Sequence, residues 1–219
     1  LVELTNASAT IDYEAIDYSA ADTVSIFSIT DSSLTLSFTE ITNMGNGDVF
    51  LISGGSNVLV NGGNLGNSGG RLFFLTNGSG TLEANYNIGN VQGQGVPAIE
   101  LDSTYTEGSF SHHCNYLEST SNCILIDDGA DPNFMNISGR YVSTSADTIN
   151  NQSTITNTPG IRADNTILVA DVSGGSVSIL SSSTLNVYCG GVLTTNDTAI
   201  PANITPIPAA NFVFDSNFL

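Results

Sequence analysis

In Ile52-Ser-Gly-Gly-Ser-Asn-Val-Leu-Val60, one apolar residue precedes a small polar turn and then alternating apolar positions. The same order recurs at Val172-Ser-Gly-Gly-Ser176, followed by the alternating pair Val177 and Ile179. Alternation over a few residues, bounded by Gly, Ser and Asn, is typical of a short strand. The recurrence of the whole unit indicates an internal repeat.

Apolar residues followed by a small polar pair extend this repeat through the chain. Their successive spacings are 23, 23, 26, 25, 23 and 23 residues. An Asn-x-Gly-Asn element, at residues 43–46, 64–67 and 87–90, gives a second phase at spacings of 21 and 23 residues. The seven apolar landmarks are Ile29, Ile52, Leu75, Leu101, Ile126, Ile149 and Val172.

The length of the period selects one fold among the repeat architectures. A propeller blade needs about 40 residues and an ankyrin unit about 33, whereas about three short strands with turns fit into 23 to 26 residues. Stacked at about 4.8 Å per coil, such units pair each strand with its equivalents in neighbouring coils. We therefore predict an all-β, right-handed, single-stranded parallel β-helix of about seven coils.

The ends of the chain differ in composition from the predicted β-helix, which spans residues 22–195. Residues 1–21 are predicted to depart from the period and to form an N-terminal cap. Residues 196–219 are predicted to fold back over the last coil or to dock on a neighbouring subunit, because proline disrupts a regular central strand. These predictions rest on Asp12, Glu14, Asp17 and Asp22 near the N-terminus, and on Pro201, Pro206, Pro208, Phe212, Phe214 and Phe218 near the C-terminus.

The charge balance excludes several classes of partner. The chain has 21 acidic residues, only three basic ones and a formal net charge of -18. Nucleic-acid binding depends on Lys and Arg to neutralise phosphates, so we expect no nucleic-acid partner. No sustained apolar run is long enough to cross a bilayer, so we expect no membrane insertion.

Through its period and turn chemistry, the sequence over residues 22–195 resembles the pectin-lyase-like family of parallel β-helices. That family includes viral tailspike and fibre modules and bacterial adhesin stalks. The resemblance implies the fold and not an activity. It also implies that a trimer is one candidate assembly, since viral β-helices are often trimeric.

Asp127, Asp128 and Asp131 are the best local candidates for chemistry. Adjacent carboxylates on one coil could act as acid and base in glycoside hydrolysis. The polygalacturonase-like branch uses such an Asp-Asp element, but its Asn-Thr-Asp, Gly-His-Gly and Arg-Ile-Lys partners are missing here. The same three carboxylates are candidates for Ca²⁺, which prefers oxygen ligands. A solvated acidic turn is the third interpretation, and no other cofactor is expected.

The segment His112-His113-Cys114 is predicted to lie in the longest loop of the repeat. A His-His-Cys cluster suggests a transition metal, but adjacent side chains of an extended segment point to opposite faces. We therefore favour a bulged surface loop. A disulfide between Cys114 and Cys123 could close that loop in an oxidising compartment, although free thiols are the simpler expectation.

Candidate N-glycosylation sequons are scattered through the chain, and in a sequence rich in Asn, Ser and Thr some arise by chance. They matter only if the protein passes through a eukaryotic secretory route. The acceptor residues are Asn6, Asn77, Asn136, Asn151 and Asn196, with a weaker candidate at Asn203.

Two classes of function follow from these observations. The first is a non-enzymatic structural or adhesive surface protein: a virion spike, fibre or capsid-decoration module, or else a microbial adhesin or surface-layer domain. Its partners would be other structural subunits or a cell-surface glycan, and its location the virion surface or the extracellular space. The alternative is a polysaccharide hydrolase or lyase acting on a neutral glycan.

Overall fold

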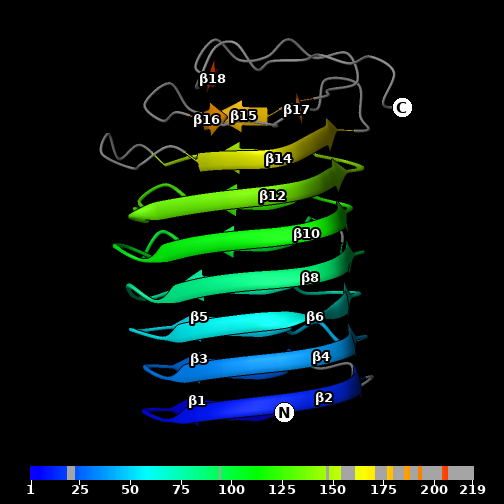
Figure 1. Cartoon of the computed structure of the whole chain (residues 1–219), viewed down its shortest axis with the longest axis vertical. Helices are drawn as coiled ribbons and strands as arrows, with labels where there is room; N and C mark the ends of the chain where they lie inside the picture. The colour runs from blue at the N-terminus through cyan, green and yellow to red at the C-terminus, as the bar shows by residue number, and fades with distance from the viewer. Residues whose placement is uncertain are drawn as a thin grey trace.

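The chain folds as an all-β parallel solenoid of about six turns, so the expected seven coils are an approximate count. The computed structural model describes residues 1–18, 23–93, 95–146 and 148–153, and beyond them the strands at 161–170, 177–179, 185–187, 192–193 and 204–206. Every strand pairing in this part of the chain is parallel, and successive coils stack along one axis (Figure 1). No helix among the described residues could span a membrane.

Each coil contributes one strand to a short-stranded sheet and one to a long-stranded sheet. The short strands are β1 (Val2–Thr5), β3 (Phe27–Thr30), β5 (Phe50–Ser53), β7 (Phe73–Thr76), β9 (Ile99–Leu101), β11 (Ile124–Ile126), β13 (Ile149–Asn151) and β15 (Val177–Ile179). The long sheet contains β2 (Ser8–Tyr18), β4 (Ser33–Asn43), β6 (Asn57–Asn67), β8 (Thr81–Val91), β10 (Ser109–Ser119), β12 (Phe134–Ser143), β14 (Ile161–Ala170), β16 (Leu185–Val187) and β18 (Ile204–Pro206), while β17 (Val192–Leu193) pairs with β14.

The coil therefore has two strands where the sequence predicted about three. In β4 the inward positions alternate up to Phe38, then Thr39 and Glu40 both face outward before Ile41 turns in again. The register also skips residue 39. A bend at this point moves the second half of the strand to another side of the coil, and this bend replaces the third strand.

The register confirms most of the apolar landmarks and corrects one. Ile29, Ile52, Leu75, Leu101 and Ile126 follow one another directly in the short sheet. The next partner of Ile126 is Asn151, whereas Ile149 pairs with Ile124. The landmark at Ile149 is therefore wrong by two positions, because a buried polar residue, Asn151, occupies the expected apolar place. Val172 lies outside the described residues.

The Asn-x-Gly-Asn elements are not equivalent in the stack, so the second phase of the repeat is wrong. Asn43, the first residue of one element, pairs with Asn67, the last residue of the next. Both side chains point inward, where their amides donate to backbone carbonyls of the following turn; the Asn43 amide lies 2.7 Å from the Gly47 oxygen. Buried side chains that pair with the backbone satisfy turn groups that would otherwise lack partners.

In the first four coils, the turn that follows the short strand has left-handed backbone. The residues after Thr5, Thr30, Ser53 and Thr76 all have φ between 48° and 67°. Asn, Asp and Gly tolerate this conformation better than other residues, which explains the composition of the repeat. The four turn residues are Asn6, Asp31, Gly54 and Asn77.

The first coil belongs to the solenoid. β1 and β2 continue the two sheets in register, with Leu4 opposite Ile29 and Ile11 opposite Leu36. This differs from the expectation that residues 1–21 depart from the period. Asp12 and Asp17, which suggested a cap, occupy outward positions and so do not disturb the inward alternation. Of the predicted tail, the structure describes only β18, which pairs with β16.

The core is a narrow column of apolar side chains between the two sheets. Three stacked rings form its most regular part: the centroids of Phe27 and Phe50 lie 4.9 Å apart, and those of Phe50 and Phe73 lie 5.0 Å apart. All three side chains are fully buried. Because equivalent positions lie one strand spacing apart, identical flat rings can stack along the axis.

Candidate functional site

The structure separates the three aspartates that the sequence put together. Asp127 follows β11 and joins Glu100 and Asp102 of the preceding coil, and ligand atoms of these three residues all lie within 4.8 Å of one another. Asp128 lies in the exposed turn that follows. The backbone of Asp131 forms a parallel bridge with Thr106. The acidic cluster of the described residues is therefore Glu100, Asp102 and Asp127.

Two of these carboxylates already have strong partners. Arg71 lies on the coil before that of Glu100, and its Nε lies 2.7 Å from Glu100 Oε2. Its guanidinium also pairs with Asp48 at 3.2 Å. Asp102 accepts hydrogen bonds from the Thr104 backbone N–H at 2.9 Å and from the Thr76 hydroxyl at 3.2 Å. Among the described residues, Asp127 has no hydrogen-bonded side-chain partner of this kind. The guanidinium of Arg71 also stacks 4.1 Å from the Phe74 ring centre.

The surroundings shift the three carboxyl groups in different directions. Partial burial raises the pKa of Glu100, although Arg71 opposes the shift. Burial and the nearby charge of Asp102 raise the pKa of Asp127. For Asp102, burial acts upward, but the hydrogen bonds from Thr104 and Thr76 outweigh it and lower the pKa. Asp102 therefore holds its negative charge most firmly, as a cation ligand needs.

His112 lies inside the solenoid and not in a loop. It is an inward residue of β10 with no exposed surface. Its Nε2 lies 2.7 Å from the Tyr86 hydroxyl, and its Nδ1 lies 2.7 Å from the Tyr141 hydroxyl. With both ring nitrogens engaged, His112 has no lone pair left for a metal. Burial lowers its pKa to about 3, so the ring is neutral at ordinary pH.

One arrangement of protons satisfies every donor of this network. If the proton of His112 is on Nδ1, it is donated to Tyr141, whose hydroxyl donates in turn to the His112 backbone carbonyl at 3.1 Å. The Tyr86 hydroxyl then donates to Nε2. A buried polar group without a partner is costly, so this tautomer is the favoured one.

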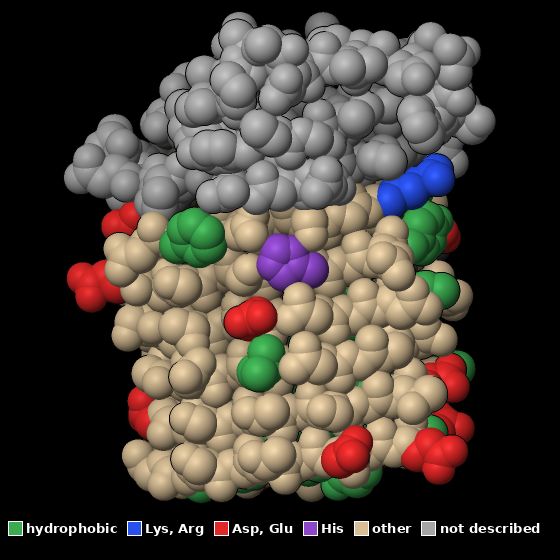
Figure 2. All heavy atoms as spheres, in the orientation of Figure 1, with side chains coloured by type: hydrophobic (Ala, Val, Ile, Leu, Met, Phe, Trp, Pro, Cys, Tyr) green, Lys and Arg blue, Asp and Glu red, His purple; other side chains and the backbone are tan. Residues whose placement is uncertain are grey.

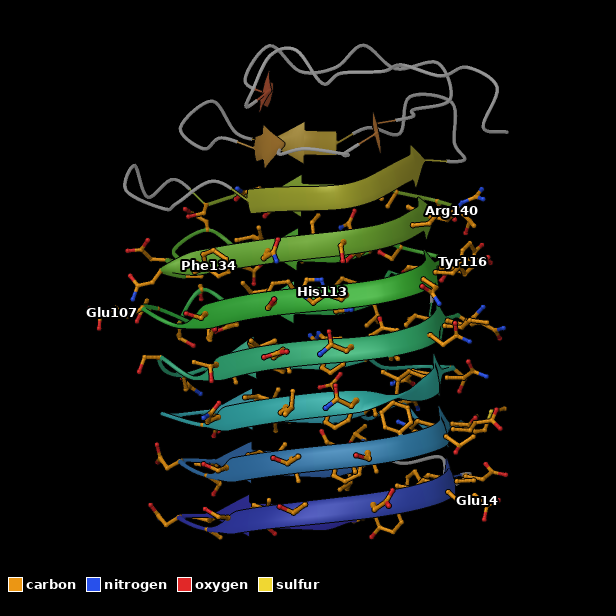
Figure 3. The ribbon with its side chains drawn as sticks, in the orientation of Figure 1. Glu14, Glu107, His113, Tyr116, Phe134 and Arg140 are labelled. Carbon is orange, nitrogen blue, oxygen red and sulfur yellow. The ribbon has the colours of Figure 1, made fainter. Side chains whose placement is uncertain are left out.

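His113 lies on the opposite face, which confirms that the two adjacent histidines diverge. Its ring makes two contacts on the outer face of the long sheet: Nε2 is 2.9 Å from the Ser111 hydroxyl and Nδ1 is 2.6 Å from the Ser138 hydroxyl. Figure 3 shows His113 on the outward side of β10. The expected surface loop is wrong, because residues 109–119 form strand β10. Its register against β12 does shift between His113 and Tyr116, so an irregularity lies within the strand.

The two described cysteines are free thiols. Cys114 is an inward residue of β10 and Cys123 precedes β11, and both are buried. Burial raises the pKa of both thiols, Cys114 to about 12. A thiol with a raised pKa forms little thiolate and is a poor nucleophile.

The sequons differ sharply in accessibility. Asn6 and Asn77 are exposed at the left-handed turn. Asn136 is half-buried, and its side-chain oxygen is buried without a hydrogen-bond partner. Asn151 points into the core and accepts a hydrogen bond from the Ser153 N–H. The side chain of Asn196 lies outside the described residues. Among the sequons whose side chains the structure describes, Asn6 and Asn77 are the two that are accessible to a glycan.

Sequence reasoning missed Glu100, Asp102, Ser111 and Ser138. A usable signal existed, because Asp102 and Asp127 are 25 residues apart, as are His113 and Ser138. One period of separation places two residues side by side on adjacent coils. A search for polar residues at that spacing would have found both groups.

Compared with protein-family models, curated proteins and solved structures, the chain matches none of them.

Proposed function

We propose that this chain is a structural or adhesive element of a surface, in the form of a virion spike, fibre or capsid-decoration module. The observation that carries the proposal is the unbroken parallel stack whose outward positions hold mainly short uncharged polar side chains. Figure 2 shows one such face, with few charged groups on its described part. A rod of this kind offers a rigid, regular surface, and the role requires no reaction.

Hydrogen bonds between equivalent outward residues strengthen the stack along its axis. Thr30 and Ser53 are 2.8 Å apart, Asn85 donates to Asn61 at 3.2 Å, and Asn115 donates to Asn87 at 2.8 Å. Such ladders resemble those of cross-β assemblies. They favour a durable extracellular part over a flexible regulator.

The charges narrow the choice of partner. Of the two arginines with described side chains, Arg71 is tied to Asp48 and Glu100, and Arg140 lies 5.9 Å from the Tyr116 ring centre. With a net charge of -18 the surface would repel nucleic acid and acidic glycans. The partners we propose are other structural subunits, including a homo-trimer, or a neutral cell-surface glycan.

Location on an outer surface tests this proposal directly. Antibodies raised against the purified chain should bind intact virions or cells of its source without permeabilisation. Labelling that appears only after permeabilisation would overturn the proposal. A microbial adhesin or surface-layer domain is distinguished from a virion module by which particle is labelled, and native mass spectrometry of the labelled particle's protein reports the trimer.

The enzyme alternative at Asp127, Asp128 and Asp131 has less support. Asp127 faces Glu100 and Asp102, while Asp128 lies in an exposed turn. Glu100 is itself neutralised by Arg71. A hydrolase needs one protonated acid and one free carboxylate aligned on the same sugar, whereas Asp127 lies in the acidic cluster and Asp128 in the exposed turn beside it.

For the cation we propose Ca²⁺ at Glu100, Asp102 and Asp127 in place of the three aspartates predicted from the sequence. Oxygen ligands from three carboxylates suit Ca²⁺. Because Arg71 already balances the charge of Glu100, Asp102 and Asp127 would balance most of the charge of the Ca²⁺ ion. Calcium chloride should raise the unfolding temperature of the wild type and not that of Asp127→Asn, with Asp12→Asn as control. An equal response of all three proteins contradicts this site.

A further inference from the structure

Two neighbouring strands build a hydrogen-bonded row of three side chains on the outer face of the long sheet. Ser111 and His113 are two residues apart on β10 and face the same side, and Ser138 of β12 pairs with His113 in the register. The imidazole bridges the two hydroxyls, with distances of 2.9 Å to Ser111 and 2.6 Å to Ser138. This is the geometry of a nucleophile, a base and a group that orients the base.

The proton positions suit this interpretation. When the neutral ring of His113 carries its proton on Nδ1, that N–H donates to the Ser138 oxygen. The lone pair of Nε2 then faces the Ser111 hydroxyl, which donates to it. Unlike His112, whose partners are all enclosed in the core, His113 is only partly buried, and a small molecule can reach the row from solvent.

The neighbouring residues provide further parts of a reaction site. Ser111 lines a hollow of about 360 Å³ that runs over β4, β6, β8 and β10, with Glu83 as its only charged group. On its other side, Ser111 pairs with Asn136 in the register. Asn136 has a side-chain oxygen that is buried without a hydrogen-bond partner. Phe134, two residues before it, is 44% exposed.

We propose that Ser111 is a nucleophile activated by His113 as general base, with Ser138 as a positioning residue, and that this site hydrolyses small uncharged acyl esters. The proposal goes beyond the structural role, since it adds a chemical activity to the same scaffold. Uncharged substrates follow from Glu83 in the hollow and from the large negative charge of the chain. Asn136 is the register partner of Ser111, and in this proposal its side-chain N–H group, not its oxygen, would donate to the oxyanion.

The reaction balances with water as the co-reactant. Ser111 Oγ attacks the ester carbonyl carbon while its proton moves to His113 Nε2. The tetrahedral intermediate collapses, the ester C–O bond breaks, and the alcohol leaves with the proton from Nε2. Water, deprotonated by Nε2, then attacks the acyl-serine; the carboxylic acid leaves, and the proton returns to Ser111 Oγ.

The experiment uses p-nitrophenyl acetate as substrate and a fluorophosphonate as a covalent probe. The wild type should release nitrophenol and carry the probe, and transiently the acetyl group, on Ser111 in peptide mass spectra. Both Ser111→Ala and His113→Gln should lower kcat/KM by about 100-fold or more, the size of a lost general base. The matched control is Ser37→Ala, an outward serine of β4, which should behave as the wild type.

Mapping of the adduct keeps the test decisive, because an exposed imidazole hydrolyses activated esters slowly by itself. If no adduct forms on Ser111, or if Ser111→Ala retains the wild-type rate, the proposal is wrong. Thermal unfolding of each variant establishes that it is folded, as expected for outward side chains. If the esterase proposal fails, the proposed surface location still stands, because antibody labelling tests that location separately.

Ser138 is tested by a readout that a merely structural residue would not change. Ser138→Ala should lower kcat by about 10-fold and shift the acid limb of the kcat/KM pH profile, because the orientation and basicity of His113 change. Ser138→Thr retains the hydroxyl and should restore both. An unchanged pH profile in Ser138→Ala overturns the positioning role.

Discussion

The solenoid core contains two adjoining regions built on opposite principles. In the first, Phe27, Phe50 and Phe73 stack face to face with interplanar angles of 11° and 8°. In the second, His112 sits between Tyr86 and Tyr141 and depends on hydrogen bonds of defined direction. Phe73 touches both regions, since its ring centre lies 6.0 Å from that of His112.

The two regions differ in how much of the sequence must be specified to build them. The phenylalanine region needs only the same large residue at each equivalent position, and the strand spacing then sets the stacking distance. The histidine region draws its three members from three different inward columns on three different coils. One region follows from repetition, whereas the other requires each partner to be present.

Of the changes predicted for these two regions, Phe50→Ala should lower the free energy of unfolding most. Removing a fully buried ring between two others should lower the free energy of unfolding by about 3–5 kcal/mol, through lost burial and the cavity left behind. Urea unfolding followed by circular dichroism measures the change. Phe50→Leu is the control: it retains most of the apolar volume and should lose less than half as much. Equal losses for both variants would mean that stacking dominates over volume.

The second-largest loss of stability should come from lowering the pH, which acts on His112 in the histidine region. The pKa of His112 is about 3 in the folded chain, against about 6.5 when unfolded. Between these values the unfolded chain binds one more proton, so stability is fully present above pH 6.5 and is lost as the pH falls toward 3. The loss is about 1.4 kcal/mol per pH unit.

The contribution of His112 is isolated by difference, because many carboxyl groups also titrate in this range. Unfolding free energies of the wild type and of His112→Leu are measured from pH 7 to pH 4. The variant should have a shallower fall in stability with acid, whatever its absolute stability. Parallel curves for the two proteins would refute a neutral buried His112.

Tyr86→Phe should lower the free energy of unfolding by less than the two changes above, because it removes one hydroxyl and retains the ring. His112 Nε2 then loses its hydrogen-bond donor in the core, which is expected to cost about 1–2 kcal/mol. The matched control is Tyr13→Phe on β2, where the tyrosine is 39% exposed and its hydroxyl can be hydrated. Similar losses in the two variants would contradict a buried network.

Ser53→Ala should have the smallest effect. It removes the 2.8 Å contact with Thr30 on the outer face, where water can replace the lost partner. The expected loss is about 0.5 kcal/mol, with Ser145→Ala in an exposed turn as the reference. A loss above that of Tyr86→Phe would show that the outer ladders stabilise the stack more than the polar core does.

Several features of the fold could be predicted from the sequence because they depend on local alternation. The apolar residues from Ile29 to Ile126 indicated the period and the parallel stack, and the opposite directions of His112 and His113 followed from the geometry of any strand. The polar turns were readable because left-handed backbone selects Asn, Asp and Gly. The third strand was mispredicted, since a bend at Thr39 leaves no distinct residue signal.

The candidate sites could not be read in the same way. The sequence grouped Asp127 with Asp128 and Asp131, which are near in the chain, whereas the structure groups it with Glu100 and Asp102. The same holds for Ser138, which joins Ser111 and His113 from another coil. Such groups form between coils, and their members are related only through the register.

That this chain is a solenoid of parallel strands can be predicted from its sequence, because each coil repeats the same alternation of inward and outward residues. Which polar side chains meet depends on the register between coils, which only the folded structure shows. Successive register partners from Ile29 to Asn151 lie 23, 23, 26, 25 and 25 residues apart. These lengths vary because turns accept inserted residues at little energetic cost, whereas the packed inward side chains fix the register.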